Sequence, residues 1–228
     1  NQINEILWAL NITGYECKYS DPRFSKTYEY GIFREQYMTL EEYKKKYFDS
    51  SRPYTVGLLE SNMYVSNGQL QPYYALIKSL EAKGCNVIPV VAAGGSENQL
   101  KVMVKYFTNA PSYEAYLNNP LKYTNNANAI ISMPAYGIGG NLFDNTTKYF
   151  ETAGVPVFRA VHSDYVSNEE WELSATGLPG NRSDKWWHVA IGEAQGIIEA
   201  TFVGGVTHEI SSKTGAQLSG FKAHEKNI

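Results

Sequence analysis

The chain has 228 residues, of which 43% are hydrophobic, and its formal net charge is −3. These values are typical of a globular protein with one large domain or two small ones, and the lack of a basic cluster argues against nucleic acid as a partner. No apolar run reaches the roughly 20 residues that a membrane-spanning helix needs, so no membrane span is expected.

Residues 1–50 differ in pattern from the rest and predict a small helical segment that packs on a main domain of residues 51–228. Near the start, helical spacing of apolar side chains predicts a short amphipathic helix carrying Ile3, Ile6, Leu7 and Leu10. A polar, tyrosine-rich connection follows. The sequence Thr39-Leu40-Glu41-Glu42 is a capping box, in which a hydroxyl and a carboxylate satisfy each other's backbone amides. It predicts a second helix that ends near Phe48.

From residue 54 onward, predicted strands and helices alternate. The expected strands cover residues 54–59, 86–91, 129–132 and 156–161, and the expected helices cover about 67–84, 97–107, 112–118 and 141–153. This alternation predicts an α/β fold with a mostly parallel sheet of about four to six strands and helices on both faces, as in flavodoxin-like and Rossmann-like layering. Apolar runs at 187–191 and 197–203 predict two more strands, which extend the sheet or form a hairpin at its edge.

Ligands of open parallel sheets bind beyond the carboxyl ends of the strands. Here these ends carry small residues, amides and aromatic residues, a mixture that suits a flat, partly apolar ligand. Tyr64 and Tyr136 are candidates for stacking on such a ligand, and the alternative for both is ordinary loop packing.

Two acids lie beside apolar sequence in the segment from Gly177 to Gly205. Glu193 lies in a polar turn between two apolar runs, and Glu199 lies on the second run. A carboxylate held against apolar walls has a displaced proton affinity and can accept protons or bind a metal. Glu193 is therefore the first catalytic candidate and Glu199 the second; the alternative is that Glu193 is a solvated turn residue.

The run VAIGEAQGIIEATFVGG, from Val189 to Gly205, resembles the signature of the large subunits of cobaltochelatase (CobN type) and magnesium chelatase (H type), which reads close to VALPELDGxxEPIVxxG. Matching positions are held by Val189, Ala190, Glu193, Gly196, Glu199, Val203 and Gly204. The signature's Pro, Leu and Asp are replaced by Gly192, Ala194 and Gln195. Further segments that begin at Val87, Ala129, Val155 and Glu169 align in the same order, so the chain is similar to an internal piece of such a subunit.

The resemblance implies that the protein binds a tetrapyrrole, either a porphyrin or a corrin, for ATP-dependent insertion of Co²⁺ or Mg²⁺. The ATP and its Mg²⁺ would be held by partner AAA+ ATPase subunits, so no cofactor is expected in this chain and the module would be inactive alone. Insertion of a metal removes two pyrrole protons, and a carboxylate such as Glu193 can accept them or bind the metal transiently.

Several other residues are expected to contact the ring or the metal within this scheme. Arg159, which ends an apolar strand, is a candidate partner for a carboxylate arm of the ring, and an ion pair with a nearby acid is the alternative. The remaining ligand-binding candidates are Tyr64, Tyr136, Gly139, Gly140 and Gln195. His188 is a weak candidate metal ligand, because its position beside two tryptophans is more typical of a packed or surface residue.

Other functions stay open at this level. One is a non-catalytic module of a surface or periplasmic protein that binds a tetrapyrrole or metallophore, which the altered signature and the richness in Asn and Tyr favour; another is a relative that removes metal from haem. A chelatase would be cytoplasmic and a surface module would lie outside the cytoplasm.

Common nucleotide and hydrolase motifs are missing, because the chain has no P-loop and no GxSxG, and Leu142 stands where a GxGxxG pattern needs glycine.

Overall fold

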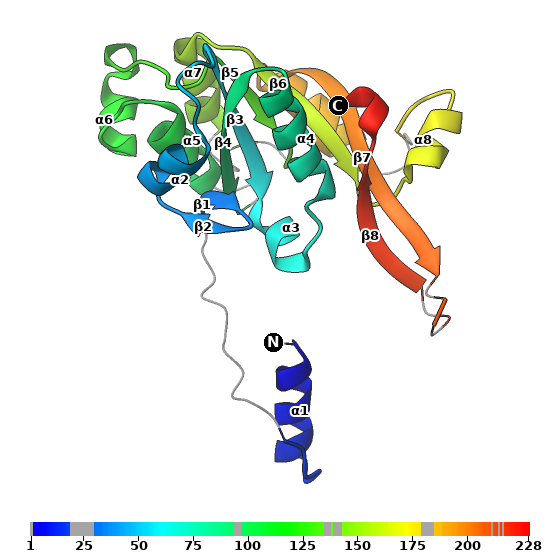
Figure 1. Cartoon of the computed structure of the whole chain (residues 1–228). Coiled ribbons are helices and arrows are strands. Elements are labelled where there is room, and N and C mark those ends of the chain that lie inside the picture. Colours follow the sequence, from blue (N-terminus) through cyan, green and yellow to red (C-terminus); the bar gives the residue numbers. More distant parts are fainter. Residues whose placement is uncertain are drawn as a thin grey trace.

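The computed structural model describes residues 2–18, 30–93, 97–134, 138, 143–178, 185–210, 212–213, 215 and 217–228. Its centre is an eight-stranded sheet in the order β2-β1-β4-β3-β5-β6-β7-β8 (Figure 1). The strands are β1 (Tyr30–Arg34), β2 (Gln36–Met38), β3 (Tyr54–Ser61), β4 (Cys85–Ala92), β5 (Ala129–Ser132), β6 (Val157–Ser163), β7 (Ile198–Ile210) and β8 (Gln217–Ala223). Strands β4, β3, β5, β6 and β7 run parallel, whereas β1, β2 and β8 pair antiparallel at the two edges.

The helices are α1 (Gln2–Ile12), α2 (Leu40–Tyr47), α3 (Asn62–Asn67), α4 (Gln71–Ala82), α5 (Glu97–Phe107), α6 (Tyr113–Asn118), α7 (Phe143–Ala153), α8 (Asn168–Leu173) and α9 (Ile191–Ala194), with short helical segments η1 (Pro120–Lys122), η2 (Lys185–Ala190) and η3 (Glu225–Asn227). Helix α1 lies apart from the sheet in Figure 1, and later helices cover both faces of the sheet. One core joins the sheet to α5 and α7, and the other joins it to α3 and α4. The predicted α/β layering is therefore confirmed, with more strands than expected.

The sequence explains the central strands directly. Strands β3 and β4 are apolar and buried along nearly their whole length, as expected for parallel strands that are covered on both faces. Gly57 of β3 has a specific packing role, because a Cβ on this residue would lie 2.8 Å from the ring of Phe107. The glycine lets helix α5 pack directly on the strand.

One predicted strand is wrong. Residues 187–191 lie in a helical stretch, in which the π-helical segment η2 runs into helix α9. The stretch lies over β6 and buries His188 and Gly192. A short apolar run has the same composition in a buried strand and in one helical turn, so its composition does not separate the two. The other predicted run, at residues 197–203, is confirmed as the start of β7, which extends the sheet parallel to β6.

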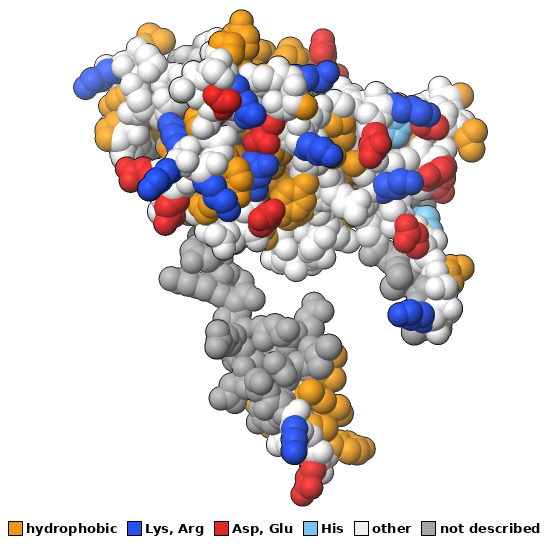
Figure 2. All heavy atoms as spheres, in the orientation of Figure 1, with side chains coloured by type: hydrophobic (Ala, Val, Ile, Leu, Met, Phe, Trp, Pro, Cys, Tyr) orange, Lys and Arg blue, Asp and Glu red, His pale blue; other side chains and the backbone are white. Residues whose placement is uncertain are grey.

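The edge strands were not predicted. Strands β1 and β2 lie within residues 1–50, where Ile32 and Tyr43 belong to the main core, whereas Ile6, Leu10 and Ile12 of helix α1 are exposed. The division of the chain at residue 50 stays a prediction. On the face shown in Figure 2, acidic and basic side chains are interspersed over the described surface.

Strand β7 approaches its neighbours unusually closely at Gly204 and Gly205. A Cβ on Gly205 would lie 2.1 Å from the carbonyl oxygen of Val166, which also accepts a hydrogen bond from the backbone amide of Val206 at 3.2 Å. The strand is also irregular earlier, because its register with β6 shifts after Phe158 and Glu199 adopts a left-handed φ of 49°. Gly205 thus allows the loop after β6 to rest on β7, and Gly204 allows the close approach of Pro72 and of the Lys222 carbonyl oxygen.

Candidate functional site

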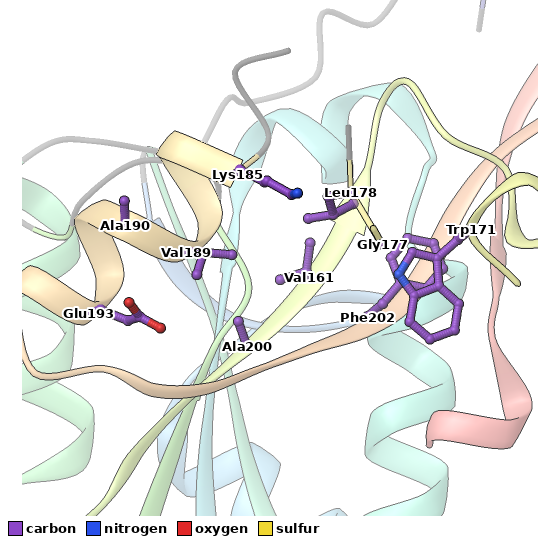
Figure 3. A pocket seen from close by; sticks show the side chains of 10 residues that line it. All are labelled: Val161, Trp171, Gly177, Leu178, Lys185, Val189, Ala190, Glu193, Ala200 and Phe202. Atoms are coloured by element: carbon purple, nitrogen blue, oxygen red, sulfur yellow. The ribbon is translucent and has the colours of Figure 1, made fainter. Parts of the chain in front are cut away.

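A pocket of about 460 Å³ lies beside strands β6 and β7. Its floor is formed by Val161, Ala200 and Phe202, and helical residues Lys185, Val189 and Glu193 lie opposite. Trp171 and Leu178 close one side (Figure 3). Most of these walls are apolar, and a volume of roughly 300–1,000 Å³ is usual for small-molecule sites. The pocket can therefore take a ligand, or part of one, with a large apolar surface.

The aromatic end of the pocket is rigidly packed. The rings of Trp171 and Phe202 are stacked with centroids 4.7 Å apart and an angle of 4° between their planes. Trp171 comes from α8, whose capping box at Ser167 fixes the start of the helix. In Figure 3 this pair and the Glu193 carboxylate lie at opposite ends of the pocket. A ligand that spans the pocket would contact flat apolar rings at one end and a carboxylate at the other.

Glu193 is carried by helix α9 and not by a turn between two strands. Its side chain is exposed to solvent and lines the pocket together with Val189. A carboxylate at the mouth of an apolar pocket is accessible to a ligand, which a carboxylate buried in the core would not be. The candidate acid of the sequence analysis therefore lies at a concave site.

A second cluster of polar side chains is buried at the carboxyl ends of β3 and β6. His162 Nε2 lies 3.1 Å from Glu60 Oε2, although the two groups are not aligned for a hydrogen bond. The ring of Tyr64 meets that of His162 edge-on at 4.3 Å, and the Tyr64 hydroxyl donates to Asp164 at 3.2 Å. Tyr64 is thus packed in the protein and does not line the pocket.

Arg159 is buried near this cluster. Its Nη1 donates to the Ser132 hydroxyl at 3.2 Å and to the carbonyl of Pro134, while Nε and Nη2 have no acceptor among the described residues. Burial lowers the pKa of Arg159 to about 10, and the Glu60 carboxylate opposes that change. The guanidinium is still protonated at neutral pH, so the cluster contains a buried cation with two unused donors.

The unused edge of Arg159 faces Gly192. A Cβ on Gly192 would lie 3.2 Å from Nη2 and 3.3 Å from Nε. Glycine at this position, where the related signature has proline, therefore leaves room for the guanidinium group of Arg159. A ligand carboxylate would reach these two donors only after Gly192 had moved aside, so the role predicted for Arg159 stays a prediction.

We expect Gly192→Ala and Arg159→Leu to be energetically coupled. Alanine normally stabilises a helix by about 1 kcal/mol relative to glycine, but here its methyl group would press on the guanidinium. Gly192→Ala should therefore fail to stabilise the protein, yet stabilise it in the shortened Arg159→Leu background. Urea unfolding of the four variants of this cycle should give a coupling of about 1–2 kcal/mol. Additive effects would mean that the contact does not constrain residue 192.

The other predicted residues occupy different places. Gln195 is buried, and its amide donates to the carbonyl of Ile138 at 2.8 Å and accepts from the amide of the same residue at 2.9 Å. Glu199 is exposed at the irregular start of β7 and does not line the pocket. Tyr136, Gly139 and Gly140 lie outside the described residues. The ligand-binding and catalytic roles of these residues stay predictions.

His188 is packed rather than open to the pocket. Its side chain is buried, its ring centroid lies 6.2 Å from that of His162, and its Nδ1 has no partner among the described residues. Burial, with smaller contributions from His162 and Arg159, holds the pKa of His188 well below its usual value. Within the described ranges, no three His, Cys, Asp or Glu side chains form a group that could hold a metal ion.

Sequence reasoning missed Lys185, Phe202 and the pairing of Glu60 with His162. The signal for the last pair was available, because both residues follow buried apolar stretches at the carboxyl ends of strands. Lys185 and Phe202 gave no signal, since they meet only through the packing of η2 on the sheet. Among the described helices, none is long and apolar enough to cross a membrane.

Comparisons with known proteins give a family, a curated relative and a solved structure of similar fold. A family model described as CobN/Magnesium Chelatase matches residues 5–228. A curated relative, "Uncharacterized protein MJ1441" of Methanocaldococcus jannaschii, is 28% identical over 184 residues, which are 76% of this chain and 14% of the relative. The catalytic subunit of cobaltochelatase from Mycobacterium tuberculosis has a similar fold, with a TM-score of 0.56 and 14% identity over 98% of this chain and 16% of that subunit. The chain thus spans a small part of the length of both relatives.

Proposed function

Because the chain belongs to the CobN/magnesium chelatase family, we propose that it is the module of a chelatase large subunit that binds a tetrapyrrole for insertion of Co²⁺ or Mg²⁺. The ring would be a porphyrin or a corrin. One observation carries this proposal: the acid of the family-like signature, Glu193, lines an apolar pocket that ends in the stacked pair Trp171–Phe202.

The chemistry of metal insertion fits these groups. A tetrapyrrole is flat and largely apolar, so it would bury part of its surface against the pocket walls and contact the aromatic pair. Insertion releases two pyrrole protons and requires the metal to lose water. Glu193 is placed to accept a proton or to lend an oxygen to the incoming ion, which is a substrate here.

The free energy for metal insertion would come from subunits other than this chain. We infer that AAA+ ATPase subunits hold ATP and Mg²⁺ and act on the complete large subunit, of which this chain matches only a small part. The module alone should then bind the ring without inserting metal. Ring binding can therefore be measured on this chain, and metal insertion on the complete large subunit.

We expect coproporphyrin or a metal-free corrin to quench the tryptophan fluorescence of this chain in a saturable way. Trp171 lies in the pocket, so Trp171→Phe should remove most of the quenching, whereas Trp186→Phe, which changes an exposed tryptophan outside the pocket, should leave it. A titration of the three proteins measures this. Absence of saturable quenching by either ring would refute tetrapyrrole binding by the module.

A non-catalytic tetrapyrrole-binding module is the second candidate. It is favoured by Gln195, which replaces the Asp of the signature and is hydrogen-bonded to the backbone of Ile138 rather than directed into the pocket. Ring binding by the module, together with a full-length protein that neither inserts metal in the presence of its ATPases nor removes it from haem, would support this alternative over both metal-transferring functions.

A further inference from the structure

The pocket contains a cation, Lys185, at the start of η2. In Figure 3 its side chain extends from η2 toward Leu178, which helps to close one side of the pocket. The ion pairs found among the described residues do not include Lys185, although Glu193 lines the same pocket. An ammonium group thus lies over apolar walls, and no carboxylate among the described residues forms an ion pair with it.

This arrangement is informative because lysine usually keeps its charged end in water and lays only its methylene groups on apolar surface. An apolar ligand would cover the walls beneath the ammonium and remove part of its hydration. Such a ligand would bind better if it brought an anionic group to the same place, since the charge-assisted hydrogen bond would then replace the lost water.

The buried Arg159 cannot bind an anionic group of a ligand in the pocket in this conformation. Its unused donors face Gly192, and the residue does not line the pocket. Lys185 is flexible, half-buried and already at the pocket, so it can adjust to the position of an anionic group without movement of helix α9.

We propose that Lys185 binds a carboxylate arm of the ligand, and hence that this pocket selects rings with acidic side chains over neutral rings of the same shape. The proposal rests on the proposed function, since the ligand is taken to be a tetrapyrrole. The ring surface would contact Trp171 and Phe202, one carboxylate arm would meet Lys185, and the edge of the ring near Glu193 would be left for proton and metal chemistry.

Coproporphyrin, which carries four carboxylates, and its tetra-amide, which carries none, test this selection. The wild-type chain should bind the acid roughly 10- to 100-fold more tightly than the amide, as one charge-assisted hydrogen bond at a half-buried site implies. Lys185→Met should abolish most of this preference by weakening the acid alone, and Lys185→Arg should keep it. Lys83→Met, which removes an exposed lysine at the end of α4, is the matched control and should change neither affinity.

The outcomes separate this proposal from the one on which it rests. If the wild-type chain binds both probes equally, or if Lys185→Met weakens both to the same extent, the carboxylate site is refuted while ring binding stands. If the wild-type chain binds neither probe, ring binding itself fails and the carboxylate site fails with it. Loss of the preference in Lys185→Met with the amide affinity unchanged supports the site.

Discussion

Glu193→Gln in the full-length large subunit is expected to lower the rate of metal insertion by roughly 100-fold or more, the usual effect of removing a positioned general base. Glutamine keeps the shape of the side chain but cannot accept a pyrrole proton and binds a divalent cation less well. The affinity for the ring should stay nearly unchanged, because the apolar walls and Lys185 remain. Insertion is measured from the change in ring absorbance with ATP and the partner ATPases present.

Two further variants make this result specific. Glu209→Gln changes an exposed acid on β7 outside the pocket and should leave insertion unchanged. Glu199→Gln tests the second candidate acid, which does not line the pocket, and we expect it to have a smaller effect than Glu193→Gln. An insertion rate that is the same for Glu193→Gln and the wild type would remove Glu193 from the mechanism.

Gly205→Ala is expected to destabilise the fold by about 3 kcal/mol or more, at the upper end of the range for overpacking. The added methyl group would meet the carbonyl oxygen of Val166 at 2.1 Å, and this oxygen belongs to the backbone and cannot rotate away. Either strand β7 or the loop after β6 must shift, with loss of the hydrogen bond from Val206. The midpoint of urea unfolding measures the change.

The control for this substitution lies on the neighbouring strand. Gly220 of β8 would place its Cβ 3.4 Å from the Thr207 hydroxyl oxygen, an ordinary contact. Gly220→Ala should therefore change stability much less than Gly205→Ala. Equal unfolding midpoints for the two variants would show that β7 and the loop after β6 can move apart without loss of stability.

The central part of the fold was predictable because buried parallel strands are short, continuous apolar runs between amphipathic helices. Strands β3, β4, β5 and β6 all have this character, and the sheet follows from their alternation with helices. Strands β1 and β8 lack it. Their mixed sequences become strands by pairing with β4 and β7, which is a property of the assembled sheet rather than of the segment.

The candidate site was predictable only in part. The importance of Glu193 came from a resemblance to a family signature, and its position at a pocket depends on contacts that no local pattern encodes. Trp171, Lys185 and Phe202 lie on three separate elements and meet only because η2 and α8 pack beside the same two strands. The reading of residues 187–191 as a strand failed for the same reason, since burial of His188 is decided by the sheet beneath it.

The paired hydrogen bonds between Gln195 and Ile138 have a mechanical consequence. They tie the segment that follows β5 to the turn directly after the helix that carries Glu193, so a displacement of one is transmitted to the other. Separating the two segments would leave the buried side-chain amide of Gln195 and the peptide groups of Ile138 without hydrogen bonds, at a cost of roughly 1–3 kcal/mol for each unsatisfied polar group. The backbone turn that follows the acid at the mouth of the pocket is thus attached to the segment after β5.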